Sequence, residues 1–136
     1  DNFEIGKIRR IKSGKDVAII SYGITVATAI EIAKKIENEG KTVTIVSCHT
    51  IKPLDEEGIS EILKNHSNVI VLEEHVPHGG LGSRIKVLAR DIKSKSEIFH
   101  YSLKDEFIHF YGNHKELLEK HGLSVLKIFK DVQNKI

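Results

Sequence analysis

Short unbroken runs of apolar residues alternate along the chain with stretches in which apolar residues recur every three or four positions. Four such runs lie at Val17–Ile20, Thr42–Ser47, Val69–Leu72 and Glu97–Tyr101. Because they are continuous and rich in β-branched residues, they are typical of strands buried on both faces. The pattern therefore predicts four buried strands separated by helices.

The stretches between the runs have the apolar period and the end residues of helices. Gly40 follows the first stretch at the position of a left-handed C-terminal cap, and Asp55 can cap the second. The predicted helices are about Thr25–Glu39, a helix after Asp55, Leu81 to about Lys93, a short helix from Asn113 to Gly122, and a last helix capped by Ser124.

The segment Lys7–Lys12 alternates basic and apolar residues ahead of the first buried run. This alternation predicts an edge strand with one exposed side. Strands that alternate with helices favour a mostly parallel sheet covered on both faces, which is the α/β class. With 136 residues, we expect a single domain over residues 1–136.

Composition and charge narrow the function classes. The 21 basic and 19 acidic residues give a net charge of +2 and are spread along the chain, which argues against a nucleic-acid or anionic-membrane partner. No apolar run reaches the ~18 residues of a membrane span. The one cysteine, Cys48, favours a reducing cytoplasm. Because no methionine is present, even at position 1, we expect a processed chain or a piece of a longer one.

A glycine cluster opens the third predicted helix. Free N–H groups and the helix dipole at Gly79, Gly80, Gly82 and Ser83 are a possible anion site. The cluster lacks the Gly-Lys-Ser/Thr of a phosphate-binding loop and the full Gly-x-Gly-x-x-Gly fingerprint. We favour a tight turn and close packing over a retained ligand site.

Two carboxylates and two histidines crowd the end of the strand before this cluster. Glu73, Glu74, His75 and His78 are the ligand types of a zinc or iron site, and paired carboxylates can also serve as a general acid. Pro77 prevents a helix from placing the histidines on one face. We therefore favour a structural or interface loop and expect no metal.

The other candidate residues have simpler interpretations. Cys48 and His49 are adjacent at a strand end, where side chains diverge, so we expect Cys48 to be a small apolar residue at the core edge and no nucleophile. The remaining histidines are expected at helix ends and in loops, solvated or capping: His66, His100, His109, His114 and His121.

Five segments taken in order resemble the carboxyl-terminal domain of transketolase-type thiamine diphosphate enzymes. They are Gly14–Gly23, the helix ATAIEIAKKIENEG, Ile51–Glu57, VIVLEEHVPHGGLGS and the tail HFYGNHKELLEKHGLS. Relatives with this domain include 1-deoxyxylulose-5-phosphate synthase and the β subunit of 2-oxo acid dehydrogenases. The resemblance covers nearly the whole chain.

The resemblance implies a three-layer α/β/α fold with a five-stranded mixed sheet, order 1-3-2-4-5, whose first strand is antiparallel. It also implies that thiamine diphosphate and Mg bind between two other domains, so that this one has no catalytic or cofactor-binding residue and is inactive alone. The partners implied are the other domains or subunit of the same enzyme, in a homodimer. No Gly-Asp-Gly, the start of the metal-diphosphate motif, occurs in the chain.

This strand order places the topological switch point between the second and fourth strands, where α/β sheets bind ligands. The loops there are Ser21–Thr25 and Glu73–Ser83. We expect any small anion bound by the domain to lie in this crevice, near Gly23, Thr25, Gly80 and Gly82.

Three functions remain open. The first is the C-terminal domain of a transketolase-like enzyme that transfers two-carbon ketol units between sugar phosphates, supporting the dimer and the cofactor domain. The second is the corresponding domain of a 2-oxo acid dehydrogenase β subunit, which docks the acyltransferase core. The third is a free-standing anion- or nucleotide-binding regulatory module, for which the glycine cluster is the only support.

Overall fold

The computed structural model describes residues 4–74, 80–102 and 125–136. The strands are β1 (Arg9–Lys12), β2 (Val17–Ser21), β3 (Val43–Ser47), β4 (Asn68–Leu72) and β5 (Glu97–Tyr101). The helices are α1 (Thr25–Glu37), α2 (Glu56–Asn65), α3 (Leu81–Asp91) and α5 (Val125–Gln133).

The strands form one five-stranded mixed sheet in the order β1-β3-β2-β4-β5. β2 pairs in parallel with both β3 and β4, and β4 pairs in parallel with β5. β1 is antiparallel to β3, with a register irregularity between Arg10 and Lys12. The expected fold class, strand order and antiparallel first strand are confirmed.

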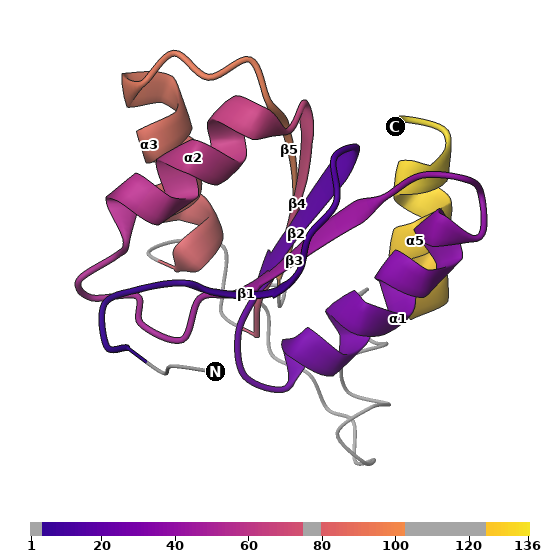
Figure 1. Ribbon diagram of the computed structural model, residues 1–136, viewed down its shortest axis with the longest axis horizontal. Helices are drawn as coiled ribbons and strands as arrows, with labels where there is room; N and C mark the ends of the chain where they lie inside the picture. Colours follow the sequence, from indigo (N-terminus) through magenta and orange to yellow (C-terminus); the bar gives the residue numbers. More distant parts are fainter. Residues whose placement is uncertain (1–3, 75–79, 103–124) are drawn as a thin grey trace, which may run out of the picture.

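Helices cover both faces of the sheet (Figure 1), with α2 and α3 on one side and α1 and α5 on the other. Alternate residues of each buried strand face opposite layers, as the strand period requires. Thus Ile19 packs toward α1 and α5, whereas Ile20 packs toward α2 and α3. The molecule has three layers and two apolar cores.

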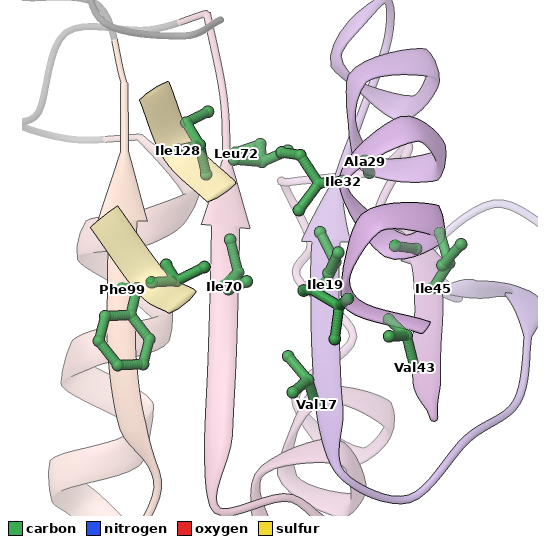
Figure 2. Close-up of a cluster of buried hydrophobic side chains, with 13 residues drawn as sticks. Val17, Ile19, Ala29, Ile32, Val43, Ile45, Ile70, Leu72, Phe99 and Ile128 are labelled. Atoms are coloured by element: carbon green, nitrogen blue, oxygen red, sulfur yellow. The ribbon is translucent and has the colours of Figure 1, made fainter. Parts of the chain in front are cut away.

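The core under α1 and α5 is built from the inward residues of four strands (Figure 2). Val17, Ile19, Ile70 and Leu72 are at most 1% exposed. Ile128 of α5 lies against the same cluster, so the last helix is buried on the face that its apolar spacing predicts.

Two expected details differ from the structure. All four residues of β1 are exposed, where one covered side was expected, because the helices pack over the central strands. Helix α1 ends at Glu37 instead of Glu39, although Gly40 has the expected positive φ of 91°. Within the described residues, no helix has the length and apolarity to cross a membrane.

Two predicted features lie outside the described residues. They are the short helix from Asn113 to Gly122 and the cap at Ser124.

Candidate functional site

The switch point between β2 and β4 lies at the carboxyl edge of the sheet, where the two expected loops meet. Thr25 begins α1 and is 2% exposed. Its hydroxyl lies 2.6 Å from the carbonyl oxygen of Tyr22 and 3.3 Å from that of Leu72, the last residue of β4. Thr25 therefore ties the two loops together, and its hydroxyl is already engaged by the backbone.

The glycines of this edge serve different backbone needs. Gly23 has a φ of 61°, and an added Cβ would meet nothing within 4 Å, so conformation alone favours glycine there. Gly80 caps α3 in an extended conformation and is buried. Gly79 lies outside the described residues. The predicted anion site around these glycines stays a prediction.

The N-terminus of α3 binds a carboxylate of the chain itself. Glu73 follows β4 and is fully buried. Its Oε2 accepts a hydrogen bond from the N–H of Gly82 at 2.7 Å, and its own N–H donates to the carbonyl of Tyr101 at 3.1 Å. A negative charge at a helix N-terminus is stabilised by the free N–H groups and the helix dipole. The carboxylate of Glu73 thus compensates the positive end of the α3 dipole.

His100 of β5 is the second partner of Glu73. Its Nε2 lies 3.5 Å from Glu73 Oε1, and the His100 side chain is 6% exposed. A Cβ added to Gly82 would stand 2.1 Å from the same Nε2. Gly82 is therefore required because the imidazole packs directly on the helix backbone, where no side chain fits.

Lys86 connects this buried pair to the surface. Its exposed ammonium lies 3.1 Å from His100 Nδ1. An ammonium can only donate, so Nδ1 of His100 accepts from Lys86. Within the described residues, Nε2 and Glu73 Oε1 lie 3.5 Å apart, and neither of them makes a hydrogen bond. Lys86, His100, Glu73 and Gly82 form one chain of contacts from solvent to the N-terminus of α3.

The remaining candidate residues of this edge have separate surroundings. Glu74 is partly exposed. Tyr22 lies near both glutamates: burial raises the pKa of its phenol, and the charges of Glu73 and Glu74 raise it further. Ser83 lines a shallow groove beside Leu54 and Glu56. The two loop histidines, His75 and His78, lie outside the described residues.

Cys48 and His49 do not form a nucleophile and base. Cys48 is 1% exposed and belongs to the core under α2 and α3, as expected. Burial, with a smaller contribution from the charge of Asp55, raises the pKa of its thiol to about 11. His49 Nε2 lies 3.0 Å from the carbonyl of Glu4.

The scattered histidines were expected at helix ends and in loops, in solvated or capping roles. This expectation is partly right for His66 and wrong for His100. His66 caps α2 but is buried, with its ring nitrogens 2.9 Å from the carbonyl of Ile62 and from Thr44 Oγ1. His100 lies in a strand. In the sequence, His100 lies two positions after Ile98 in a predicted strand, and this spacing indicates that both side chains face the same layer. Ile98 faces the core under α2 and α3. His109, His114 and His121 lie outside the described residues.

The described residues of this edge do not fit thiamine diphosphate with its metal. Among them, no three histidine, cysteine, aspartate or glutamate side chains are placed to hold a metal ion. The N-terminus of α3 at this edge already holds the Glu73 carboxylate, which would repel a diphosphate.

The sheet order, the antiparallel edge strand and the helices on both faces define a three-layer α/β/α domain with its switch point between β2 and β4. The chain belongs to the transketolase family: the family model for "Transketolase, C-terminal domain" matches residues 6–128.

Similar proteins agree with this assignment. The chain is 32% identical over 131 residues to a 1-deoxy-D-xylulose-5-phosphate synthase of Mannheimia succiniciproducens and 36% identical over 132 residues to that of Dictyoglomus thermophilum. The matches cover 96% and 97% of this chain but 20% and 21% of those proteins. The chain thus spans about a fifth of the length of these relatives.

A solved structure has the same fold at similar sequence identity. It is a split-gene transketolase, described as an inactive β4 tetramer, with a TM-score of 0.88 and 33% identity. The match covers 98% of this chain and 43% of that one.

Proposed function

We propose that this chain acts as the C-terminal domain of a transketolase-like thiamine diphosphate enzyme that transfers two-carbon ketol units between sugar phosphates. The domain supports the homodimer and the cofactor-binding domain and does not catalyse alone. Thiamine diphosphate and magnesium are held by the other parts of the enzyme, and the cofactor supplies the carbanion chemistry.

The observation that carries the proposal is the match over residues 6–128 to a family whose other members here are about five times longer. The carboxyl edge supports the same conclusion, since its buried carboxylate, Glu73, contacts α3 and His100 of the same chain. The matched split-gene transketolase, whose tetramer is described as inactive, gives a precedent for a part that needs its complement.

The loop at the carboxyl edge is the proposed contact with the rest of the enzyme. Glu73 is buried and anchors the start of this loop to α3. We therefore expect the other polar residues of the loop, Glu74, His75 and His78, to contact the partner. Ile24, in the neighbouring loop, is 49% exposed. An exposed large apolar residue beside a polar loop is the composition of an interface core and its rim.

The activity is tested on the intact enzyme that contains this chain, supplied with thiamine diphosphate and magnesium. We expect ketol transfer from a ketose phosphate to an aldose phosphate, measured by the change in sugar-phosphate products. The variant Ile24→Asp should weaken assembly, measured by light scattering, and lower activity with it. Lys34→Asp, a change on the exposed side of α1, is the matched control.

A second candidate activity is favoured by the names of the sequence relatives, which are 1-deoxy-D-xylulose-5-phosphate synthases. The same enzyme preparation distinguishes the two. Formation of 1-deoxy-D-xylulose 5-phosphate without ketol transfer would replace the first activity by the second and would leave the role of this domain unchanged. Absence of both activities from a folded, cofactor-loaded enzyme would contradict the proposal.

A further inference from the structure

An open groove of about 520 Å³ lies at the amino edge of the sheet, opposite the switch point. It is formed where the chain enters β2, β4 and β5 and where α2 and α3 end. Its lining is mostly polar: Lys15, Leu63, Lys64, Asn65, His66, Ser67, Ile92, Lys93, Ser94, Lys95 and Ser96. The four lysines come from three separate connections, so their clustering is not visible in the sequence.

The four ammonium groups of this groove have no acidic partner among the described residues. None of Lys15, Lys64, Lys93 and Lys95 belongs to an ion pair there, and all four are exposed. Asp16, which feels the charge of Lys15, has its carboxylate 2.6 Å from the N–H of Thr42. As far as the described residues go, no ion pair balances the positive charge of this groove.

The ordinary role of lysines at helix ends is to satisfy the last carbonyls, and other groups fill that role here. The carbonyl of Ile62 lies 2.9 Å from His66 Nδ1, and that of Leu63 accepts from Ser96 Oγ at 2.6 Å. At the end of α3, the N–H of Ser94 donates to the carbonyl of Ala89 at 2.8 Å. The ammonium groups are not needed as caps.

Lys93 also stands at a position that suits glycine better. It follows the C-cap of α3 with a φ of 55°, the only positive φ of a non-glycine residue in the described part of the chain. Helices commonly place glycine there because it adopts this conformation without a steric cost. Lys93 nevertheless lines the groove at this position, where glycine would avoid the strain of the positive φ.

We propose that the amino-edge groove is a binding site for a small multivalent anion that bears phosphate groups. Its volume lies in the range of small-molecule sites, roughly 300–1,000 Å³. Lysines act as point charges toward phosphate, whereas planar carboxylates are preferentially paired with arginine. No arginine is among the residues that line this groove. Several ammonium groups around one groove favour an anion with more than one charge.

The site is independent of the proposed enzymatic role. It lies at the amino ends of β2, β4 and β5, whereas the expected crevice lies at their carboxyl ends. His66, with both ring nitrogens bonded, forms a fixed wall of the groove and is not a ligand in this proposal.

The test is a titration of the ¹⁵N-labelled 136-residue chain with inorganic diphosphate, and separately with inorganic phosphate, at constant ionic strength. We expect saturable amide shifts confined to the groove, at Ser67 and from Lys93 to Ser96, with diphosphate bound more tightly than phosphate. The double variant Lys93→Gly/Lys95→Gln should weaken diphosphate binding about tenfold or more, since two of four charges are lost.

Stability separates a binding role from a structural one. Lys93→Gly alone should leave the melting temperature unchanged or raise it, because glycine relieves the positive φ, while it lowers the affinity. Lys34→Gln/Lys130→Gln, two exposed lysines of α1 and α5, should bind as the wild type does. If the double variant is poorly folded, Lys64→Gln gives the same comparison.

Shifts that grow linearly without saturation, or that are equal in the double variant and the control, would overturn the proposal. So would a short single-stranded oligonucleotide that binds across a wider surface while diphosphate does not bind, because this outcome would assign the charge to a macromolecular partner.

Discussion

At the scale of single residues, the buried carboxylate of Glu73 is the group whose environment decides the structure of the carboxyl edge. A buried carboxylate is costly unless it is paired and hydrogen-bonded. Here the N–H of Gly82 donates to Oε2, and the imidazole of His100 lies 3.5 Å from Oε1, which accepts no hydrogen bond from the described residues. The segment after β4 is thereby fixed to α3 and to β5.

Removal of this carboxylate should be strongly destabilising. In Glu73→Ala, the Gly82 N–H loses its buried acceptor and the His100 imidazole loses the adjacent carboxylate, which we expect to cost about 3 kcal/mol. Glu73→Gln keeps an acceptor and should cost about half as much. Urea unfolding measures both, with the exposed Glu61→Ala of α2 as control. A loss for Glu73→Ala no larger than that of the control would contradict the pairing.

Gly82 and His100 should be energetically coupled. The Cβ of Gly82→Ala would collide with the imidazole, so we expect a loss of roughly 1–3 kcal/mol from overpacking. Because His100→Ala removes the ring, the double variant should lose less than the sum of the two single losses. Additive losses in a double-mutant cycle of unfolding free energies would show that the two residues do not touch.

The raised pKa of the Cys48 thiol predicts a loss of stability at alkaline pH. The pKa rises from 9.0 to about 11 on folding, so the folded state favours the neutral thiol. This stabilisation is complete below pH 9 and is lost as the pH rises toward 11. At pH 10 the loss is on the order of 1 kcal/mol. Cys48→Ala should flatten this part of the pH profile; parallel profiles for the two proteins would contradict it.

At the scale of elements, Asp55 joins the start of the chain to α2. Its Oδ1 caps α2 by accepting from the N–H of Gly58 at 3.0 Å, and its Oδ2 accepts from the N–H of Ile8 at 2.9 Å. The Asp55 side chain therefore both caps the N-terminus of α2 and binds the backbone of the segment that leads into β1.

Asp55→Ala should destabilise the chain and loosen β1 together. The lost cap alone is worth about 1 kcal/mol, and the amide of Ile8 loses its acceptor as well. Thermal unfolding gives the first effect, and hydrogen exchange of the β1 amides gives the second. Asp55→Asn keeps one acceptor oxygen for the two N–H groups, so it should show an intermediate effect. Unchanged exchange in β1 would limit Asp55 to its capping role.

The sequence predicted the elements well because their patterns are local. The strands at Val17, Val43 and Val69 are continuous β-branched runs. Asp55 caps the start of α2, and Gly40 follows the end of α1, both as expected. The strand order came from the family resemblance, since no local pattern fixes which parallel strands are neighbours.

The candidate site could be predicted only in part. The crowding of Glu73 beside the glycines of α3 was visible, but its partner His100 is 27 positions away on β5 and meets it through the parallel pairing of β4 and β5. The same limit applies to the amino-edge lysines, which tertiary folding brings to one groove. Pairings that depend on register across a sheet are not encoded in local spacing.

At the scale of the whole molecule, the two edges of the sheet have different characters. The carboxyl edge neutralises its own helix N-terminus with Glu73 and exposes Ile24, as suits a proposed contact with the rest of an enzyme. The amino edge keeps four ammonium groups without acidic partners among the described residues. We propose that this domain contributes to the assembly of the enzyme and that the cofactor binds elsewhere.

The most direct test of that claim is a calorimetric titration of thiamine diphosphate and magnesium into the 136-residue chain, with its fold verified by amide dispersion in an NMR spectrum. The same titration into the intact enzyme is the positive control. We predict saturable binding to the intact enzyme. We predict none to the isolated chain, apart from binding at the amino-edge groove that Lys93→Gly/Lys95→Gln weakens about tenfold or more. Magnesium-dependent binding of micromolar affinity that survives this substitution would contradict the account.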